Sequence, residues 1–174
     1  MPVEELRARI REVPDFPKPG ILFYDITTLL KDGPSFREAI DLMLEPFLET
    51  PVDVVVGMES RGFIFSAPMA YRLGVGLVAV RKLGKLPHET LSIEYALEYG
   101  SDVLEVHIDA IEPGARVIVL DDVLATGGTA HAKIELVERL GGVVVGALFV
   151  IELSFLHGRE RISGTDVHAL ITYS

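Results

Sequence analysis

The sequence lacks several residue types, and each absence narrows what the chain can be. Its 174 residues include no cysteine, which excludes a disulfide framework and thiolate chemistry. Asparagine, glutamine and tryptophan are missing as well. Because absence of the heat-labile amides is a compositional trend of thermophilic proteins, we expect a thermophilic source.

Long apolar runs and an excess of positive charge are also missing. No hydrophobic stretch approaches the length that crosses a membrane, and no basic and then apolar leader opens the chain, so we expect a cytoplasmic protein without a membrane partner. The net charge of −10 argues against a nucleic-acid partner. A chain of this length forms one domain with a sizeable core, and we predict a single domain over residues 1–174.

The most informative stretch is Val117–Thr129. Its first four residues are apolar, which predicts a buried strand of a parallel sheet, and the carboxyl ends of such strands hold ligands in open α/β sheets. Gly127 and Gly128 let the backbone approach a ligand, and the helix expected over Ala130–Leu140 directs unpaired N–H groups at it, which suits a phosphate. Neither a lysine after the glycines nor a Gly-x-Gly-x-x-Gly pattern is present. We therefore predict a loop that binds one phosphate group.

Two adjacent aspartates, Asp121 and Asp122, precede this loop. Successive strand residues face opposite sides of a sheet, so both carboxylates reach one ligand only if the strand end twists. Like charges so close raise each other's pKa unless cations or hydroxyl donors offset them. A sugar diol with magnesium nearby meets that need. The alternative is that both aspartates merely end a strand and cap a turn.

The segment Asp121–Thr129 resembles the phosphoribosyl-pyrophosphate binding motif of the type I phosphoribosyltransferases, and its Ala-Thr-Gly-Gly-Thr form resembles the adenine-specific members. The resemblance implies an α/β fold with a mostly parallel doubly wound sheet, a small N-terminal hood (about residues 1–30) and a mobile lid. It also implies a homodimer that makes AMP and pyrophosphate from adenine and phosphoribosyl pyrophosphate, with Mg²⁺ carried by the substrate and no protein metal ligand. Ribose and 5′-phosphate would contact Asp121, Asp122, Ala125, Thr126, Gly127, Gly128 and Thr129.

Two further strand ends carry cations in this acidic chain. Glu59-Ser60-Arg61-Gly62 follows a predicted strand at Val52–Met58, and Arg81-Lys82-Leu83-Gly84-Lys85 follows another at Leu77–Val80. Both segments resemble pyrophosphate-binding loops of the family, which implies a cis peptide at Glu59–Ser60. By this resemblance Arg61, Arg81, Lys82 and Lys85 contact pyrophosphate, and Arg61 and Lys85 also offset charge on the leaving group. The alternative for Arg61 is a surface salt bridge.

The segment Ile21–Leu30 resembles the family's base-binding hood. This implies that Phe23 stacks on the purine, that the backbone of Leu22 and Tyr24 pairs with it, and that Leu153 lines the base pocket. Tyr24 stands where the family has a basic residue. Because side-chain contacts at that position do not carry over, hypoxanthine, guanine or xanthine remain alternative bases.

Residues 87–106 form either a surface hairpin that turns near Gly100 or a lid. The resemblance implies a lid, with Glu98 as acid/base beside the purine and Tyr99 as a gate. A more distant alternative is a regulator that senses phosphoribosyl pyrophosphate and binds nucleic acid, although the acidic charge opposes it. Elsewhere the patterns predict helices over Val3–Val13 and Gly33–Leu48, and strands over Val143–Ile151 and, at a sheet edge, Val167–Ile171.

Overall fold

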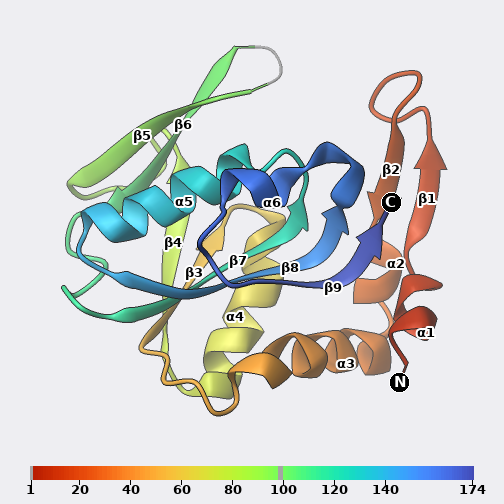
Figure 1. The fold of residues 1–174 in the computed structure, drawn as a ribbon, viewed down its shortest axis with the longest axis horizontal. Helices are drawn as coiled ribbons and strands as arrows, with labels where there is room; N and C mark the ends of the chain where they lie inside the picture. The colour runs from red at the N-terminus through yellow and green to blue at the C-terminus, as the bar shows by residue number, and fades with distance from the viewer. Residues whose placement is uncertain (1, 98–99) are drawn as a thin grey trace.

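A seven-stranded mixed sheet forms the centre of the computed structural model, which describes residues 2–97 and 100–174 (Figure 1). The strand order is β5-β6-β4-β3-β7-β8-β9. Five strands are mutually parallel: β3 (Val54–Met58), β4 (Gly76–Lys82), β7 (Arg116–Leu124), β8 (Val143–Leu153) and β9 (Val167–Tyr173). The predicted mostly parallel sheet is confirmed, and β9 lies at an edge as expected.

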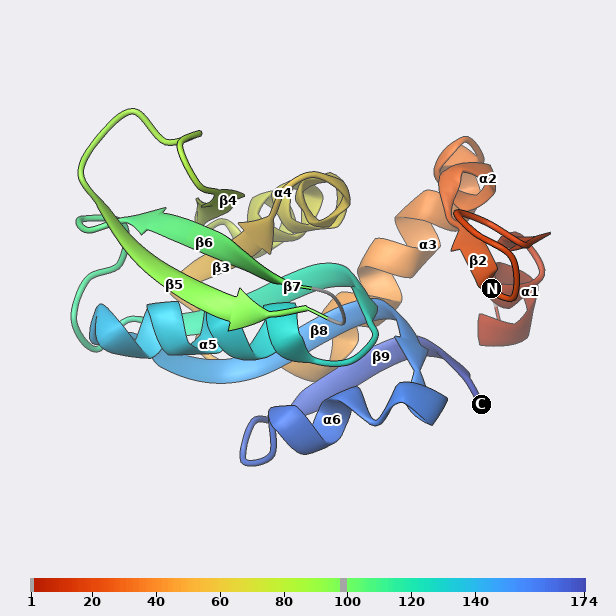
Figure 2. The ribbon, with the colours of Figure 1, turned by 90° about the horizontal axis from the view of Figure 1, so that it is seen from above.

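Helices cover both faces of this sheet, which explains why its strands are continuous apolar runs. Figure 2 shows α4 (Arg61–Leu73) and α5 (Gly128–Arg139) on opposite sides. Successive strand residues alternate between the two cores: Val55 packs with α4 and α3 (Gly33–Leu44), whereas Val56 packs with α5. The doubly wound arrangement is therefore confirmed.

The N-terminal residues form a separate layer, in which β1 (Arg11–Pro14) and β2 (Leu22–Asp25) pair antiparallel and α1 (Val3–Arg7) and α2 (Thr27–Leu30) flank them. The helix predicted over Val3–Val13 is wrong beyond Arg7. Val13 precedes a proline, a position that disfavours helix, and its backbone pairs with Phe23 instead. Figure 1 shows this layer beside the C-terminal end of β9.

The helix predicted over Gly33–Leu48 is shorter than expected. It ends at Leu44 and gives way to a 3₁₀ turn at Glu45–Phe47, because Pro46 has no N–H to continue the helical hydrogen bonds. The short helix α6 (Gly158–Arg161) was not predicted; it packs beside α5. No helix among the described residues is long and apolar enough to span a membrane.

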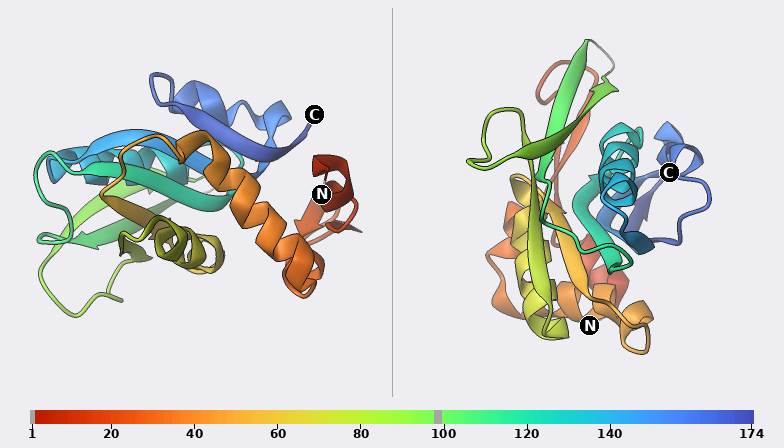
Figure 3. Two further views of the ribbon diagram at one scale, coloured as in Figure 1. Left: turned by 90° about the horizontal axis from the view of Figure 1, so that it is seen from below. Right: turned by 90° about the vertical axis from the view of Figure 1, so that its left-hand side faces the viewer.

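A hairpin, one of the two alternatives for residues 87–106, is present as β5 (Thr90–Ala96) and β6 (Ser101–His107). It extends the sheet because Arg81 and Lys82 of β4 pair with β6, and Figure 3 shows it projecting beyond the sheet. The end of β5 reaches α5: the Ala96 carbonyl oxygen lies 3.4 Å from where a Cβ on Gly128 would be. The predicted lid residues Glu98 and Tyr99 lie outside the described residues.

Candidate active site

One cleft of about 530 Å³ gathers most of the residues that the sequence singled out. It lies between the N-terminal layer and the carboxyl ends of β3, β4, β7 and β8. Ten predicted site residues line it: Leu22, Phe23, Tyr24, Arg61, Lys82, Asp121, Asp122, Ala125, Thr129 and Leu153. Residues predicted to contact the base, the ribose and the pyrophosphate thus line one cleft.

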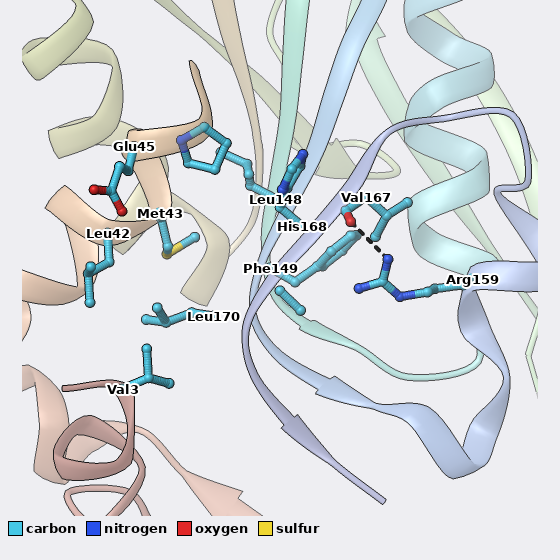
Figure 4. Close-up of a pocket in the computed structure, with 12 residues that line it drawn as sticks. Val3, Leu42, Met43, Glu45, Leu148, Phe149, Arg159, Val167, His168 and Leu170 are labelled. Atoms are coloured by element: carbon cyan, nitrogen blue, oxygen red, sulfur yellow. Dashed lines mark hydrogen bonds between the residues drawn. The ribbon is translucent and has the colours of Figure 1, made fainter. Parts of the chain in front are cut away.

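A second cavity, of about 350 Å³, lies between α3, β8 and β9 (Figure 4). Its lining includes none of the predicted site residues. Arg159, one of its lining residues, binds the Val167 carbonyl oxygen at 2.8 Å and both carboxylate oxygens of Glu152. The predicted site residues therefore gather at the larger cleft and not here.

The two aspartates differ from the prediction in one respect. They lie inside β7, which continues to Leu124, and do not end the strand. Both are nevertheless nearly buried, at 8% and 6% exposure, and both line the cleft. The side chain of Asp121 accepts hydrogen bonds from the Lys133 ammonium at 2.7 Å and from the Asp122 backbone N–H at 2.9 Å.

Asp122 has a different partner. Its Oδ2 lies 2.5 Å from Nε of Arg61, the first residue of α4. Burial raises the pKa of Asp122 to about 6, and the neighbouring charge of Asp121 adds to this increase, while Arg61 opposes it. Two carboxylates of β7 therefore pair with two cations, one from α4 and one from α5, at the wall of the cleft.

The predicted phosphate loop forms a small cavity of about 70 Å³, lined by residues 123–130. Gly127 has φ +84°, and a Cβ there would lie 2.4 Å from the Gly158 carbonyl oxygen. Glycine is therefore required at 127 both by its backbone conformation and by the close approach of α6. The twelve-residue helix α5 begins at Gly128, so its free N–H groups face this cavity, as an anion site requires.

The cation cluster is organised around Glu59. The predicted cis peptide at Glu59–Ser60 is present. Glu59 accepts hydrogen bonds from Lys85 Nζ at 2.8 Å, from the Lys82 backbone N–H at 2.7 Å and from Arg81 at 3.3 Å. Burial raises the pKa of Glu59, but these donors outweigh it and lower the pKa to about 2.

The four predicted pyrophosphate cations thus fall into two groups. Arg61 and Lys82 line the cleft, and they pair with Asp122 and Asp102 respectively. Arg81 and Lys85 bind Glu59 instead and do not line the cleft themselves. Three of the four cations gather around Glu59, whereas Arg61 pairs with the acid pair of β7, and only Arg61 and Lys82 open into the cleft.

The side of the cleft formed by the N-terminal layer is built on aromatic contacts. The Phe23 ring lies 5.6 Å from the Arg61 guanidinium and packs edge-on against Phe16. The Tyr24 ring stacks on Tyr173 with centroids 3.8 Å apart. The side chain that replaces the family's basic residue therefore joins the N-terminal layer to β9.

Sequence reasoning missed three residues at this site. Lys133 precedes Val137 by four residues on the apolar stripe of α5, and a lysine in that position was a detectable sign of a buried charge. The Tyr95 hydroxyl shares a hydrogen bond with the Thr129 side chain. Arg161 of α6 places a guanidinium nitrogen 3.2 Å from where a Cβ on Gly128 would be. No motif pointed to these last two.

Comparisons with known proteins agree with this geometry. A phosphoribosyl transferase domain model matches residues 25–169. The adenine phosphoribosyltransferase of Acetivibrio thermocellus is 55% identical over 97% of this chain and 99% of that protein.

Two crystal structures are also similar. That of adenine phosphoribosyltransferase from Thermoanaerobacter pseudethanolicus has a TM-score of 0.96 at 52% identity, covering 99% of this chain and 100% of that one. The Saccharomyces cerevisiae enzyme, in complex with an imino-altritol bisphosphate and adenine, has a TM-score of 0.91 at 43% identity and 97% coverage of both chains. The chain therefore belongs to the phosphoribosyltransferase family, and within it to the adenine phosphoribosyltransferases.

Proposed function

We propose that this protein transfers the phosphoribosyl group of phosphoribosyl pyrophosphate to adenine, giving AMP and pyrophosphate. One observation carries the proposal: a single cleft contains an acid pair, an adjoining phosphate-type loop, strand-end cations and the aromatic N-terminal layer. The names of the similar enzymes support the same reaction. They give no support to a regulatory role or to another base.

In this proposal Asp121 and Asp122 hold the ribose hydroxyls, and the loop of residues 125–129 binds the 5′-phosphate. Arg61, Arg81, Lys82 and Lys85 contact pyrophosphate. The described residues contain no group of three or more His, Asp or Glu side chains that would hold a metal. Since Mg²⁺ prefers substrate phosphates and water to an all-protein cage, we propose that it arrives on the pyrophosphate.

Positive charge develops at the anomeric carbon as pyrophosphate leaves, and the bond to the purine nitrogen forms there. Arg61 and Lys85 offset the negative charge that builds on the leaving group. Glu98 is proposed to accept the purine proton, and Tyr99 and the hairpin to exclude water that would hydrolyse the sugar.

Adenine is the proposed base because the similar enzymes are named for it. In this proposal the backbone of residues 22–24 pairs with the purine, and Phe23 and Leu153, which both line the cleft, contact it. The Tyr24 ring stacks on Tyr173, so we propose that base recognition at this position uses the backbone and not the side chain.

The assembly and setting are proposed on separate grounds. An apolar strip on α4, with Ile64 39% and Tyr71 86% exposed, supports a homodimer, which light scattering and a Tyr71→Glu variant would test. The composition supports a heat-stable cytoplasmic protein with one domain, its hood contributed by about residues 1–30.

The direct test is product formation from phosphoribosyl pyrophosphate and Mg²⁺ with adenine, hypoxanthine, guanine and xanthine in separate reactions. AMP from adenine alone is expected, and Asp122→Asn should lower kcat/KM for the sugar substrate by about 10- to 100-fold, the loss of a hydrogen bond to a charged group. Preference for an oxo-purine would contradict the base assignment. No turnover with any base, together with salt-dependent nucleic-acid binding, would favour the regulator instead.

A further inference from the structure

Lys133 is a buried charge that the proposed chemistry does not use directly. Its side chain is 1% exposed, and it lies on α5 among the apolar residues of the core between α5 and the sheet. Burying an ammonium group is costly unless an opposite charge and hydrogen bonds compensate it. Lys133 has both, since Nζ lies 2.7 Å from Asp121 Oδ2 and 3.3 Å from the Leu120 carbonyl oxygen.

The other contacts of Asp121 fix its carboxylate from two further directions. Oδ1 accepts the Asp122 N–H at 2.9 Å. Gly62 of α4 approaches so closely that a Cβ there would lie 2.8 Å from the same oxygen. The carboxylate therefore has one defined position at the cleft wall, and Lys133 supplies its charged contact.

Lys133 also connects two parts of the sugar site. The helix that carries it begins at the phosphate loop, and the strand that carries its partner holds the acid pair. The ion pair therefore joins the helix that follows the proposed 5′-phosphate subsite to the strand that carries the proposed ribose subsite. It also balances one of two adjacent carboxylates, as Arg61 balances the other.

We propose that Lys133 is a positioning residue for phosphoribosyl pyrophosphate, which orients and charge-balances Asp121 at the ribose end of the cleft. This inference rests on the proposed function. Lys133 does not contact the substrate itself; it acts through Asp121. Adenine recognition, on the other side of the cleft, is independent of it.

The test is a double-mutant cycle of Lys133→Met and Asp121→Asn, with the KM for each substrate, kcat and thermal stability measured for each variant. Lys133→Met should raise the KM for phosphoribosyl pyrophosphate by roughly 10- to 100-fold, the range found when supporting partners of binding groups are removed. The KM for adenine should change by less than about twofold. In the Asp121→Asn background, Lys133→Met should add little, because the partner it orients is already altered.

Arg139→Met is the matched control, since Arg139 lies on the same helix and pairs with Glu135 on the exposed surface. It should leave both KM values unchanged. If Lys133→Met fails to fold, Lys133→Gln, which retains a hydrogen-bond donor, replaces it in the cycle with the same criteria.

Two outcomes would overturn the inference. One is a Lys133 variant that loses stability but keeps the wild-type KM for phosphoribosyl pyrophosphate, which would make the ion pair purely structural. The other is full additivity with Asp121→Asn. Absence of AMP formation by the wild-type protein would instead contradict the proposed function.

Discussion

Two carboxylates that line the same cleft have opposite properties. Glu59, after β3, is surrounded by donors from Lys82, Lys85 and Arg81, and its pKa is lowered to about 2. Asp122, in β7, has one cation and a charged neighbour, and its pKa is raised to about 6. Burial and the charge of Asp121 raise the pKa of Asp122, whereas three donors outweigh burial at Glu59.

The difference indicates what each carboxylate does. Glu59 has its acceptor positions filled by the protein, so its role is to organise the cations around it. Asp122 has a partner on Oδ2 and lines the cleft, so it keeps acceptor capacity for substrate hydroxyls. In one part of the cleft, the carboxylate of Glu59 therefore holds three cationic residues in place. In another part, Lys133 and Arg61 hold the two carboxylates of β7 in place.

The largest effect should come from disrupting the β7 end altogether with Gly127→Ala. The new Cβ would lie 2.4 Å from the Gly158 carbonyl oxygen, and φ is +84°. We expect kcat/KM for phosphoribosyl pyrophosphate to fall by about 100-fold or more, as when a preorganised donor is lost.

Gly74→Ala is the control, because Gly74 also has positive φ (+70°) but nothing within 4 Å of the position that a Cβ would take. It should lower only the stability, by roughly 1–2 kcal/mol in the free energy of unfolding, the cost of a left-handed non-glycine residue, which a lower melting temperature would show. Equal loss of activity in both would mean that the contact with α6 is irrelevant.

A pH profile sharpens the comparison without a mutation. As pH falls through about 6, Asp122 takes up a proton while Glu59 stays ionised. The kcat/KM for phosphoribosyl pyrophosphate should therefore fall about tenfold per unit below that pH. Ionisation of the substrate affects the wild type and Asp122→Asn equally. The part of the fall in kcat/KM at acidic pH that is lost in the variant is therefore caused by Asp122. A limb unchanged in the variant would contradict the assignment.

The ionisation of Asp122 and of Glu59 also makes the free energy of unfolding depend on pH, in opposite directions. The raised pKa of Asp122 means that stability from this group falls as pH rises from about 4 to 6. The lowered pKa of Glu59 means that its contribution is present above about 4.5 and is lost as pH falls toward about 2.

A smaller effect is expected from Glu59→Gln. The amide keeps the shape of the side chain but not its charge, so Lys85 and Arg81 lose the group that orients them. We expect the KM for pyrophosphate in the reverse reaction to rise by roughly 5- to 10-fold, about 1 kcal/mol, with little change for AMP. Asp53→Asn provides the control, because Asp53 also forms an ion pair with an arginine, Arg116, but does so away from the cleft. Tighter pyrophosphate binding would mean that Glu59 competes for the cations.

The smallest effect should come from Tyr24→Phe. The stack on Tyr173 is retained, and the backbone that faces the base is unchanged. We expect the KM for adenine to stay within about twofold and hypoxanthine to remain unused. A switch of base preference would show that the hydroxyl takes part in recognition.

The local sequence pattern was sufficient to predict most strands of the sheet and the loops that follow them. The strand around Val119, the phosphate loop and the hairpin at Gly100 were all predicted, because periodicity and turn residues act over a few positions. The N-terminal helix was overpredicted, since the choice between helix and strand at Val13 depends on its pairing with Phe23.

The ion-pair partners of the site residues could not be predicted from the sequence. Lys133 and Asp121 are twelve residues apart, and Lys85 and Glu59 twenty-six. Such pairs depend on how a helix packs against its strand or how one strand end meets the next. The sequence predicted which groups gather at the cleft, but not which cation each carboxylate holds.

The stack of Tyr24 on Tyr173 has a consequence for biosynthesis. These residues are 149 positions apart, yet their rings are in contact, with Arg7 over Tyr173 as well. A chain growing on the ribosome makes β2 early, but this stack cannot form until β9 has been synthesised. The contact between the N-terminal layer and β9, which closes one wall of the cleft, is thus completed only after nearly the whole chain has been made.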